Sequence, residues 1–268
     1  MIRTRISVLG SLFALSSAAW AQTSPDEAVH LRVLPGWVQE DGTQMAAIDL
    51  QLAQGWKTYW RVPGDAGIPP RFSWRGARNV EWVKVHWPTP SVFWQSGMRS
   101  VGYENRVVLP LTVSRKRPGK DSRLKGSIDI GVCSDICVPV TLHVDTVLPA
   151  ANAGRDATIA ASLAALPYTR AEAGVRAVAC SLEPTTEGMQ ITATLTMPSS
   201  GGSEEAVIEP PAAGVWVSDA QTKRQGDRLT ITAEMVSYTD DPIFVDRSSL
   251  GIMVIGDSYA VEITGCAE

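Results

Sequence analysis

The feature of this sequence that most constrains its fold is a pair of closely spaced cysteines between two alternating apolar segments. Cys133 and Cys137 are separated by four positions. Apolar and polar residues alternate in 124–130, before the pair, and in 138–144, after it. Period-two alternation is typical of β-strands with one buried face. The sequence therefore predicts two consecutive strands with the cysteines where one ends and the next begins, in exposed rather than core positions.

A disulfide between Cys133 and Cys137 would close only a short loop. Because short loops constrain the unfolded chain less than long ones, stabilisation is a weak reason for a bridge here. The pair favours thiol–disulfide exchange, which needs an accessible sulfur and a thiolate; the alternative is a staple at the tip of a hairpin. The negative charge of Asp135, between them, disfavours a thiolate and would raise the pKa of either thiol. This suits a site that reacts only with a complementary partner.

Four cysteines allow three pairings. Local spacing favours Cys133 with Cys137, which leaves Cys180 with Cys266. A loop as long as the second would stabilise the fold by ~4–5 kcal/mol in the chain-entropy model. We therefore expect one labile bridge and one structural bridge.

The first 21 residues have the form of a secretory signal peptide. Arg3 and Arg5 precede an apolar segment, 6–19, and Ala19-Trp20-Ala21 is a small-x-small cleavage site. No later segment approaches the ~20 apolar residues needed to cross a bilayer, so we expect an exported mature chain without a membrane span. Disulfides persist in such compartments. A net charge of −4 gives no electrostatic reason to expect nucleic acid or an acidic membrane surface as a partner.

Many short alternating segments with glycine and proline between them predict an all-β protein. The sequence predicts two β-sandwich domains, at 22–150 and 151–268, joined by a short linker at 149–154 and one helix at 155–166, which Pro167 ends. Between the strands of the first domain, 91–103 is expected to be an irregular loop. The predicted strands are 29–34, 44–52, 55–60, 71–74, 80–87, 107–113, 124–130, 138–144, 175–182, 189–197, 206–209, 215–218, 228–235, 251–255 and 259–264.

Four motifs in this order resemble a known family. They are Gly-Trp-Lys-Thr-Tyr-Trp at 55–60, Pro-Gly-Asp-Ala-Gly-Ile-Pro-Pro at 63–70, Val-Gly-Tyr-Glu-Asn-Arg-Val-Val-Leu-Pro at 101–110 and Cys-Ser-Asp-Ile-Cys-Val-Pro at 133–139. Seven of the nine tryptophans lie between Trp37 and Trp94. Together these features resemble the N-terminal periplasmic domain of DsbD, the thiol:disulfide interchange protein, and especially its ScsB-like relatives. The resemblance covers about 30–148 and, more loosely, the second half.

The resemblance implies an immunoglobulin-like fold at the end of an electron relay, with protein-disulfide reductase activity in the periplasm and no cofactor. Such a domain takes two electrons from a thioredoxin-like donor and passes them to thioredoxin-fold partners. The family's attacking cysteine maps to Cys137 and its resolving cysteine to Cys133, although well-studied members have a longer cysteine spacing. Since this sequence contains neither the family's membrane domain nor its thioredoxin domain, the expected donor is a separate membrane-bound or soluble protein.

The family's cap loop maps to about 93–98, with Phe93 or Trp94 as the expected cover over the cysteines; the alternative is that both rings lie in the core. Met98 belongs to the same segment. Further expected surroundings of the site are Tyr59, Trp60, Asp65, Tyr103 and Asp135. For Tyr59, Trp60 and Asp65 the alternative is ordinary core with a turn-forming aspartate. Tyr103 is expected to pack its ring and satisfy its hydroxyl locally.

A second class of function is a non-catalytic binding module, either a copper-handling protein or an immunoglobulin-like adaptor. Cys133, Cys137, His143 and Met98 carry ligand atoms that suit Cu(I). However, His143 lies within a predicted strand and Met98 on a distant loop, so a filler role for Met98 is favoured and no metal site is predicted. The second domain is expected to serve as a docking or spacing module.

Overall fold

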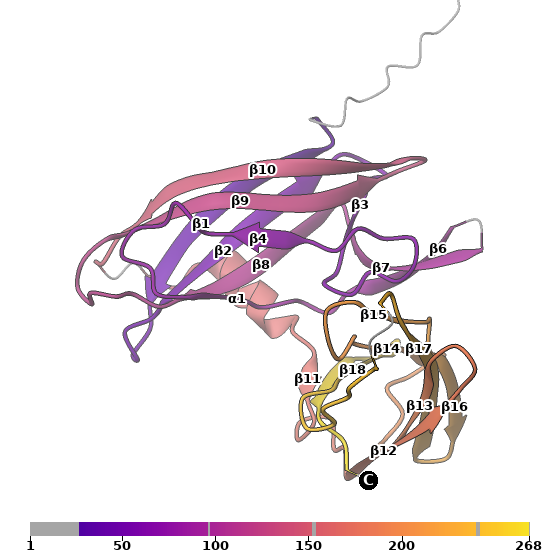
Figure 1. Ribbon diagram of the computed structural model, residues 1–268. Coiled ribbons are helices and arrows are strands. Elements are labelled where there is room, and N and C mark those ends of the chain that lie inside the picture. The colour runs from indigo at the N-terminus through magenta and orange to yellow at the C-terminus, as the bar shows by residue number, and fades with distance from the viewer. Residues whose placement is uncertain (1–26, 96, 152–153, 240–241, 268) are drawn as a thin grey trace, which may run out of the picture.

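The computed structural model describes residues 27–95, 97–151, 154–239 and 242–267. Within these residues the chain forms two β-sandwiches, built from strands β1 to β10 and β11 to β19, with helix α1 between them in the sequence (Figure 1). The predicted all-β fold class is confirmed. The expected signal peptide, Ser96 of the cap segment and residues 152–153 of the linker lie outside the described residues.

The first sandwich contains two antiparallel sheets. One has the strand order β1-β2-β8-β5, and the other has the order β10-β9-β3-β7-β6, with β4 paired to β9. Ile48, Leu111, Leu124 and Ile128 are among the fully buried residues of the core between them. The strands are β1 (Val29–Val38), β2 (Gln44–Leu52), β3 (Lys57–Tyr59), β4 (Arg71–Ser73), β5 (Val83–Val85), β6 (Ser91–Gln95), β7 (Met98–Glu104), β8 (Arg106–Val113), β9 (Ser122–Cys133) and β10 (Cys137–Leu148).

The second sandwich also contains two sheets, in the orders β11-β19-β18-β14 and β12-β13-β17-β15, with β16 paired to β17. A disulfide joins Cys180, on β12 of one sheet, to Cys266, which follows β19 of the other sheet. It therefore links the two sheets of this sandwich. The elements are α1 (Ala157–Ala164), β11 (Tyr168–Thr169), β12 (Ala177–Pro184), β13 (Met189–Thr196), β14 (Glu205–Ile208), β15 (Val215–Val217), β16 (Gln221–Gln225), β17 (Arg228–Ser237), β18 (Gly251–Ile255) and β19 (Ala260–Thr264).

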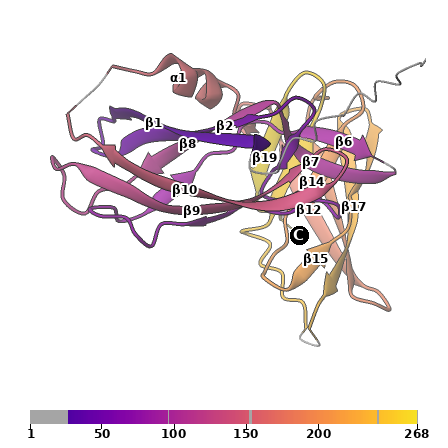
Figure 2. The same cartoon turned by 90° about the horizontal axis from the view of Figure 1, so that it is seen from above.

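Helix α1 forms where the sequence predicts it and packs on the first sandwich. Asp156 caps its N-terminus by accepting hydrogen bonds from the backbone N–H groups of Thr158 and Ile159. Ile159 is fully buried against Trp37 and Met45. Figure 2 shows α1 on one side of the sheet that contains β1 and β8, with β9 and β10 on the other side.

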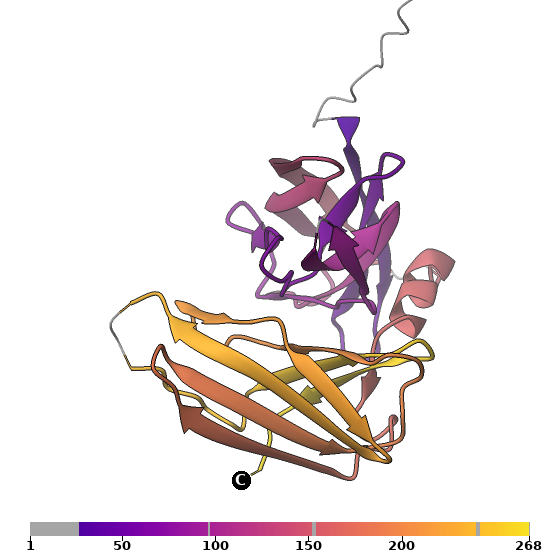
Figure 3. The same cartoon turned by 90° about the vertical axis from the view of Figure 1, so that its right-hand side faces the viewer.

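The two sandwiches share an apolar contact. Val207, Met253 and Ala260, on β14, β18 and β19, belong to the core of the first sandwich, whereas neighbouring residues such as Ile252 and Val254 face the core of the second. The sheet of β14, β18 and β19 is therefore buried on both faces. Figure 3 shows the second sandwich, in orange and yellow, below the first.

The predicted irregular loop at 91–103 is wrong, because β6 and β7 form an antiparallel hairpin there. Its local sequence lacks an apolar alternation of the kind found in β9 and β10. The hairpin is held instead by pairing of β7 with β3 and by contacts of Arg99, on β7, with Glu205 and Asp219 of the second sandwich. Strand β16 was not predicted either; its residues are polar, and it pairs only with β17 among the described strands.

A buried carboxylate on β2 links three strands of the first sandwich. Asp49 is fully buried and accepts hydrogen bonds from Arg32, on β1, at 2.7 Å and from Arg106, on β8, at 2.8 and 3.0 Å. Burial acts to raise the pKa of Asp49, but the two guanidinium groups outweigh it and the pKa is lowered. The ionised carboxylate therefore stabilises the folded state.

We expect Asp49→Asn to lower the free energy of unfolding by about 1.5–3 kcal/mol at pH 7, because it removes the charged acceptor of the hydrogen bonds from Arg32 and Arg106, whose guanidinium groups are partly exposed. This contribution is fully present above the unfolded-state pKa of about 3.9 and is lost as the pH falls through the lower folded-state pKa. The difference between the variant and the wild-type protein should thus shrink below about pH 4. Urea unfolding at several pH values measures it. Asp145→Asn, which breaks an exposed pair with Arg123, is the control and should have a much smaller effect.

Candidate active site

The two cysteines lie at the tip of the β9–β10 hairpin. The strands stay in register from Ser122 and Leu148 to the last pair, Cys133 and Cys137. Residues 134–136 form the turn, in which the Ser134 N–H donates a hydrogen bond to the Ile136 carbonyl at 3.1 Å. A disulfide joins the two sulfurs, and the Cα atoms are 4.2 Å apart.

The two sulfur-bearing residues differ in exposure. Cys133 is 3% exposed, whereas Cys137 is exposed. The expectation that both cysteines are exposed is therefore wrong for Cys133. The physical reason is the strand order: β10 is at the edge of its sheet, whereas β9 is covered by β3, whose Lys57 pairs with Cys133. Cys137 is therefore the more accessible of the two sulfur-bearing residues.

The hydroxyl of Tyr59 lies against the disulfide. It is 2.6 Å from Cys133 Sγ and 3.2 Å from Cys137 Sγ. Because disulfide sulfurs carry no proton, the tyrosine must be the donor. Burial raises the pKa of Tyr59, so the hydroxyl stays protonated at neutral pH. It can therefore donate to a sulfur in both redox states of the pair.

Gly131 makes room for this tyrosine. A Cβ atom at Gly131 would lie 2.7 Å from Ile68 Cβ and 3.0 Å from the Tyr59 ring. The ring thus sits directly over the backbone of β9, and the loop 62–70 closes against it: the Tyr59 hydroxyl is also 3.3 Å from the Ala66 carbonyl. A side chain at 131 would displace the tyrosine from the sulfurs.

The β6–β7 hairpin covers one side of the cysteine turn. Phe93 and Gln95 alternate with Trp94 along β6, so they share the face opposite to it. The Gln95 side-chain amide donates to the Ser134 carbonyl at 3.1 Å. The ammonium of Lys57 lies 4.6 Å from the centre of the half-buried Phe93 ring. Phe93 therefore lies on the cysteine side of the hairpin, whereas Trp94 is 62% exposed on the other face.

Other residues expected around the site lie elsewhere or at its margin. Trp60 is fully buried in the core of the first sandwich, as is most of Tyr103, whose hydroxyl donates to the Pro88 carbonyl at 2.8 Å. Asp65 accepts a hydrogen bond from the indole of Trp216, in the second sandwich, at 2.7 Å. The last two expected residues are exposed: Met98 is 56% exposed, and Asp135 lies in the cysteine turn.

Two contacts of the site were missed by the sequence analysis. Lys57 could have been found, since alternation along 55–60 places it on the same face as Tyr59. Gln95 carried no signal, because the segment that contains it was expected to be a loop. Its position becomes meaningful only once β6 is known to pair with β7.

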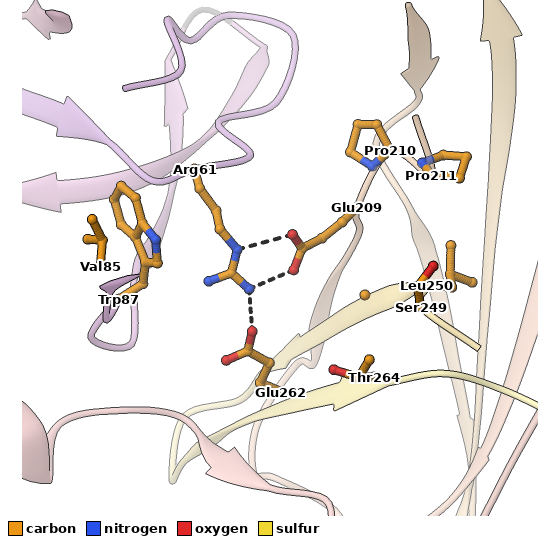
Figure 4. A pocket seen from close by; sticks show the side chains of 11 residues that line it. Arg61, Val85, Trp87, Glu209, Pro210, Pro211, Ser249, Leu250, Glu262 and Thr264 are labelled. Atoms are coloured by element: carbon orange, nitrogen blue, oxygen red, sulfur yellow. Dashed lines mark hydrogen bonds and ion pairs between the residues drawn. The ribbon is translucent and has the colours of Figure 1, made fainter. Parts of the chain in front are cut away.

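A cavity of about 370 Å³ lies between the two sandwiches (Figure 4). Its charged side chains pair with one another: Arg61 binds Glu209 at 2.6 Å and Glu262 at 2.5 Å. The guanidinium also stacks on Trp60, 4.2 Å from the ring centre. The cavity is therefore part of the contact between the sandwiches.

Within the described residues, no group of three or more histidine, cysteine, aspartate or glutamate side chains could hold a metal ion. His143, a candidate copper ligand, lies on β10 opposite Ser127. The described part of the chain also has no helix that is long and apolar enough to cross a membrane.

Comparison with known proteins gives a match to a family model and a likeness to solved structures. Residues 23–149 match the model of the family described as thiol:disulfide interchange protein DsbD, N-terminal. The crystal structure of the N-terminal periplasmic domain of ScsB from Proteus mirabilis is similar with a TM-score of 0.69 and 24% sequence identity, over 92% of this chain and 97% of that chain. At this identity the likeness concerns the fold alone, and it extends over both sandwiches. No curated protein matches the sequence.

The unequal exposure of the two cysteines predicts unequal reactivity. After reduction of the pair, we expect iodoacetamide to alkylate Cys137 roughly tenfold or more faster than Cys133, because alkylation requires access to the sulfur. Peptide mass spectrometry after timed alkylation measures both rates. Equal rates would contradict the geometry described for the pair.

Proposed function

We propose that this chain exchanges disulfides with thioredoxin-fold proteins of the periplasm through Cys133 and Cys137, and the match of residues 23–149 to the family model of the DsbD N-terminal domain supports this. The observation that carries the proposal is the disulfide between an exposed Cys137 and a buried Cys133, with a tyrosine hydroxyl against both sulfurs. An exposed sulfur is open to attack, and a buried neighbour is positioned to leave and later to return.

In the first half-reaction the pair is reduced by a donor dithiol. A thiolate of the donor attacks Cys137 Sγ, the Cys133–Cys137 bond breaks, and Cys133 leaves as a thiolate that accepts a hydrogen bond from Tyr59. The donor's second thiolate then attacks the donor sulfur that is bonded to Cys137 Sγ. The mixed disulfide breaks and Cys137 is released as a thiolate. Two electrons and two protons pass to this chain, and the donor becomes a disulfide.

In the second half-reaction the reduced pair delivers those electrons. The Cys137 thiolate attacks a sulfur of the partner disulfide and forms a mixed disulfide, and the partner's leaving sulfur takes a proton. Cys133 then attacks Cys137 Sγ, which restores the original bond and releases the second partner thiol. The chemistry needs no group beyond the two sulfurs and a proton donor.

Location and partner class follow from the same proposal. The expected signal peptide at 1–21 and two disulfides suit an oxidising compartment such as the periplasm. The donor is a membrane-bound or soluble reductase, and the acceptors are thioredoxin-fold proteins. In this scheme Phe93 is the cover on the cysteine side, and a docking partner must displace or pack against it.

Serine variants of the two cysteines test the proposal. With a purified thioredoxin-fold protein as the partner, Cys133→Ser should accumulate a mixed disulfide through Cys137, because no resolving sulfur remains. Cys137→Ser should lose exchange. Non-reducing electrophoresis and mass spectrometry measure both outcomes. Exchange at the wild-type rate in both single variants would exclude this role for the pair. The Cys180–Cys266 bridge, which should stay oxidised throughout, is the internal control.

Tyr59→Phe tests the hydroxyl. A hydrogen bond to a charged acceptor contributes about 1.5–3 kcal/mol, and 1.4 kcal/mol corresponds to ~30 mV for a two-electron couple. Since the hydroxyl favours the Cys133 thiolate over the thiol, its loss should lower the reduction potential of the pair by roughly 30 mV at an alkaline pH at which the reduced Cys133 is ionised. Quantitative alkylation in dithiothreitol or glutathione buffers measures this.

The matched control is Tyr103→Phe, which removes a hydroxyl that is bonded to the Pro88 carbonyl instead. Its potential should equal that of the wild-type pair. If both variants shift the potential equally, the effect comes from packing and the role assigned to the Tyr59 hydroxyl is wrong.

A further inference from the structure

We propose that Arg99 is a positioning residue for the exchange site, through which the second sandwich holds the β6–β7 hairpin against the cysteine turn. This inference rests on the proposed function, because it assigns the second sandwich a part in the same reaction.

The backbone of Arg99 belongs to the first sandwich, but its side chain makes hydrogen bonds and ion pairs with residues of the second. It lies on β7 and is only 3% exposed. Its Nε donates to Glu205 at 3.1 Å, its Nη1 to Asp219 at 3.2 Å and its Nη2 to the Ala206 carbonyl at 3.1 Å. A buried guanidinium is costly unless its donors are satisfied, and its planar fork accepts few geometries. These contacts therefore fix where β7 lies relative to β14 and the turn after β15.

The hairpin transmits that position to the cysteines. Arg99 pairs with Trp94 across the hairpin, and the next pair is Met98 with Gln95. Arg99 thus lies on the face toward the second sandwich, whereas Gln95, on the other face, donates to the Ser134 carbonyl at 3.1 Å. In Figure 1, β6 and β7 lie between the tip of the β9–β10 hairpin and the second sandwich.

The loop behind Tyr59 is held by the same patch of the second sandwich. Asp65 binds the Trp216 indole. Gly64 has a positive φ of +79°. A Cβ atom at this position would lie 3.1 Å from the Arg99 carbonyl oxygen and 3.4 Å from Asp219 Oδ1, so the backbone of the loop lies close to both residues. The loop 62–70, β7 and the second sandwich therefore meet at Gly64. The hairpin and the loop, which both contact the surroundings of the disulfide, therefore meet the second sandwich at the same place.

The Arg99 contacts are not needed to keep the two sandwiches together. Arg61 binds Glu209 and Glu262 across the same interface, and Val207 and Met253 supply apolar contact. Removing a partner of Arg99 should therefore loosen the hairpin while the sandwiches remain joined. Because the hairpin covers one side of the cysteine turn next to β3, access to the buried Cys133 sulfur should rise, whereas Cys137 is already exposed.

The test uses full-length protein in which dithiothreitol has reduced the Cys133–Cys137 pair and left Cys180–Cys266 oxidised. The variants are Arg99→Ala, Arg99→Lys and Asp219→Ala, and the control is Glu262→Gln, which removes an ion pair from the same interface away from the hairpin. Iodoacetamide alkylation rates of Cys133 and Cys137 are measured separately by peptide mass spectrometry. All are measured well below each variant's melting temperature, with circular dichroism to verify that each is folded.

We expect Arg99→Ala and Asp219→Ala to raise the alkylation rate of Cys133 roughly three- to tenfold. A tenfold increase corresponds to a decrease of about 1.4 kcal/mol in the free energy needed to open the hairpin. The Cys137 rate should change by less than about twofold. Arg99→Lys, which keeps the charge but loses the fork, should be intermediate, and Glu262→Gln should match the wild-type protein. A merely destabilising role would not change Cys133 alone in folded protein.

The inference is overturned if Cys133 reacts at the wild-type rate in both Arg99→Ala and Asp219→Ala, or if Glu262→Gln has an equal effect. These results leave the proposed function intact, because the wild-type pair still reduces selectively. By contrast, a wild-type pair as resistant to dithiothreitol as Cys180–Cys266 would contradict the proposed function itself, and the role of Arg99 with it.

Discussion

The pairing of β3 with β9 is the constraint on which the site depends. Lys57 pairs with Cys133 and Thr58 with Val132, and the Thr58 hydroxyl donates to the Gly131 carbonyl at 2.9 Å. This register places Tyr59 over Gly131 with its hydroxyl at the sulfurs. A slip of one residue would turn the tyrosine to the opposite face of the sheet. The chemistry of the pair therefore rests on backbone pairing of a strand that is only three residues long.

The same strand order gives two chemically identical side chains different exposure. Cys137 is on an edge strand and exposed, whereas Cys133 is on the neighbouring strand and covered by β3. A mixed disulfide at Cys137 keeps the second sulfur close by, because the two Cα atoms are 4.2 Å apart. Resolution is then an intramolecular step, which proximity favours strongly. In the proposed exchange, an edge strand with a covered neighbour thus separates the sulfur that would bind the partner from the sulfur that would release it.

Sequence patterns predicted the elements whose stability is local and missed those that depend on distant contacts. Alternation identified β9, β10, β13 and β17, since each buries one face in a core. The β6–β7 hairpin has no such pattern, because β3 and the second sandwich hold it. Likewise, Asp65 could be recognised as part of a motif, but its partner, Trp216, is 151 residues away. Burial of Cys133 was missed because exposure at a hairpin tip depends on which strands lie alongside.

The second sandwich was expected to serve as a docking or spacing module, and its packing argues against a passive spacer. Strands β14 and β18 carry continuous apolar runs, Ala206-Val207-Ile208 and Ile252-Met253-Val254, as expected for strands buried on both faces. Such a sheet cannot be solvated on its outer side at low cost, so the first sandwich must cover it. A spacer needs no buried face toward its neighbour. The burial fixes the position of the second sandwich, and Glu205 and Asp219 can then hold Arg99, and with it the β6–β7 hairpin, at a defined place.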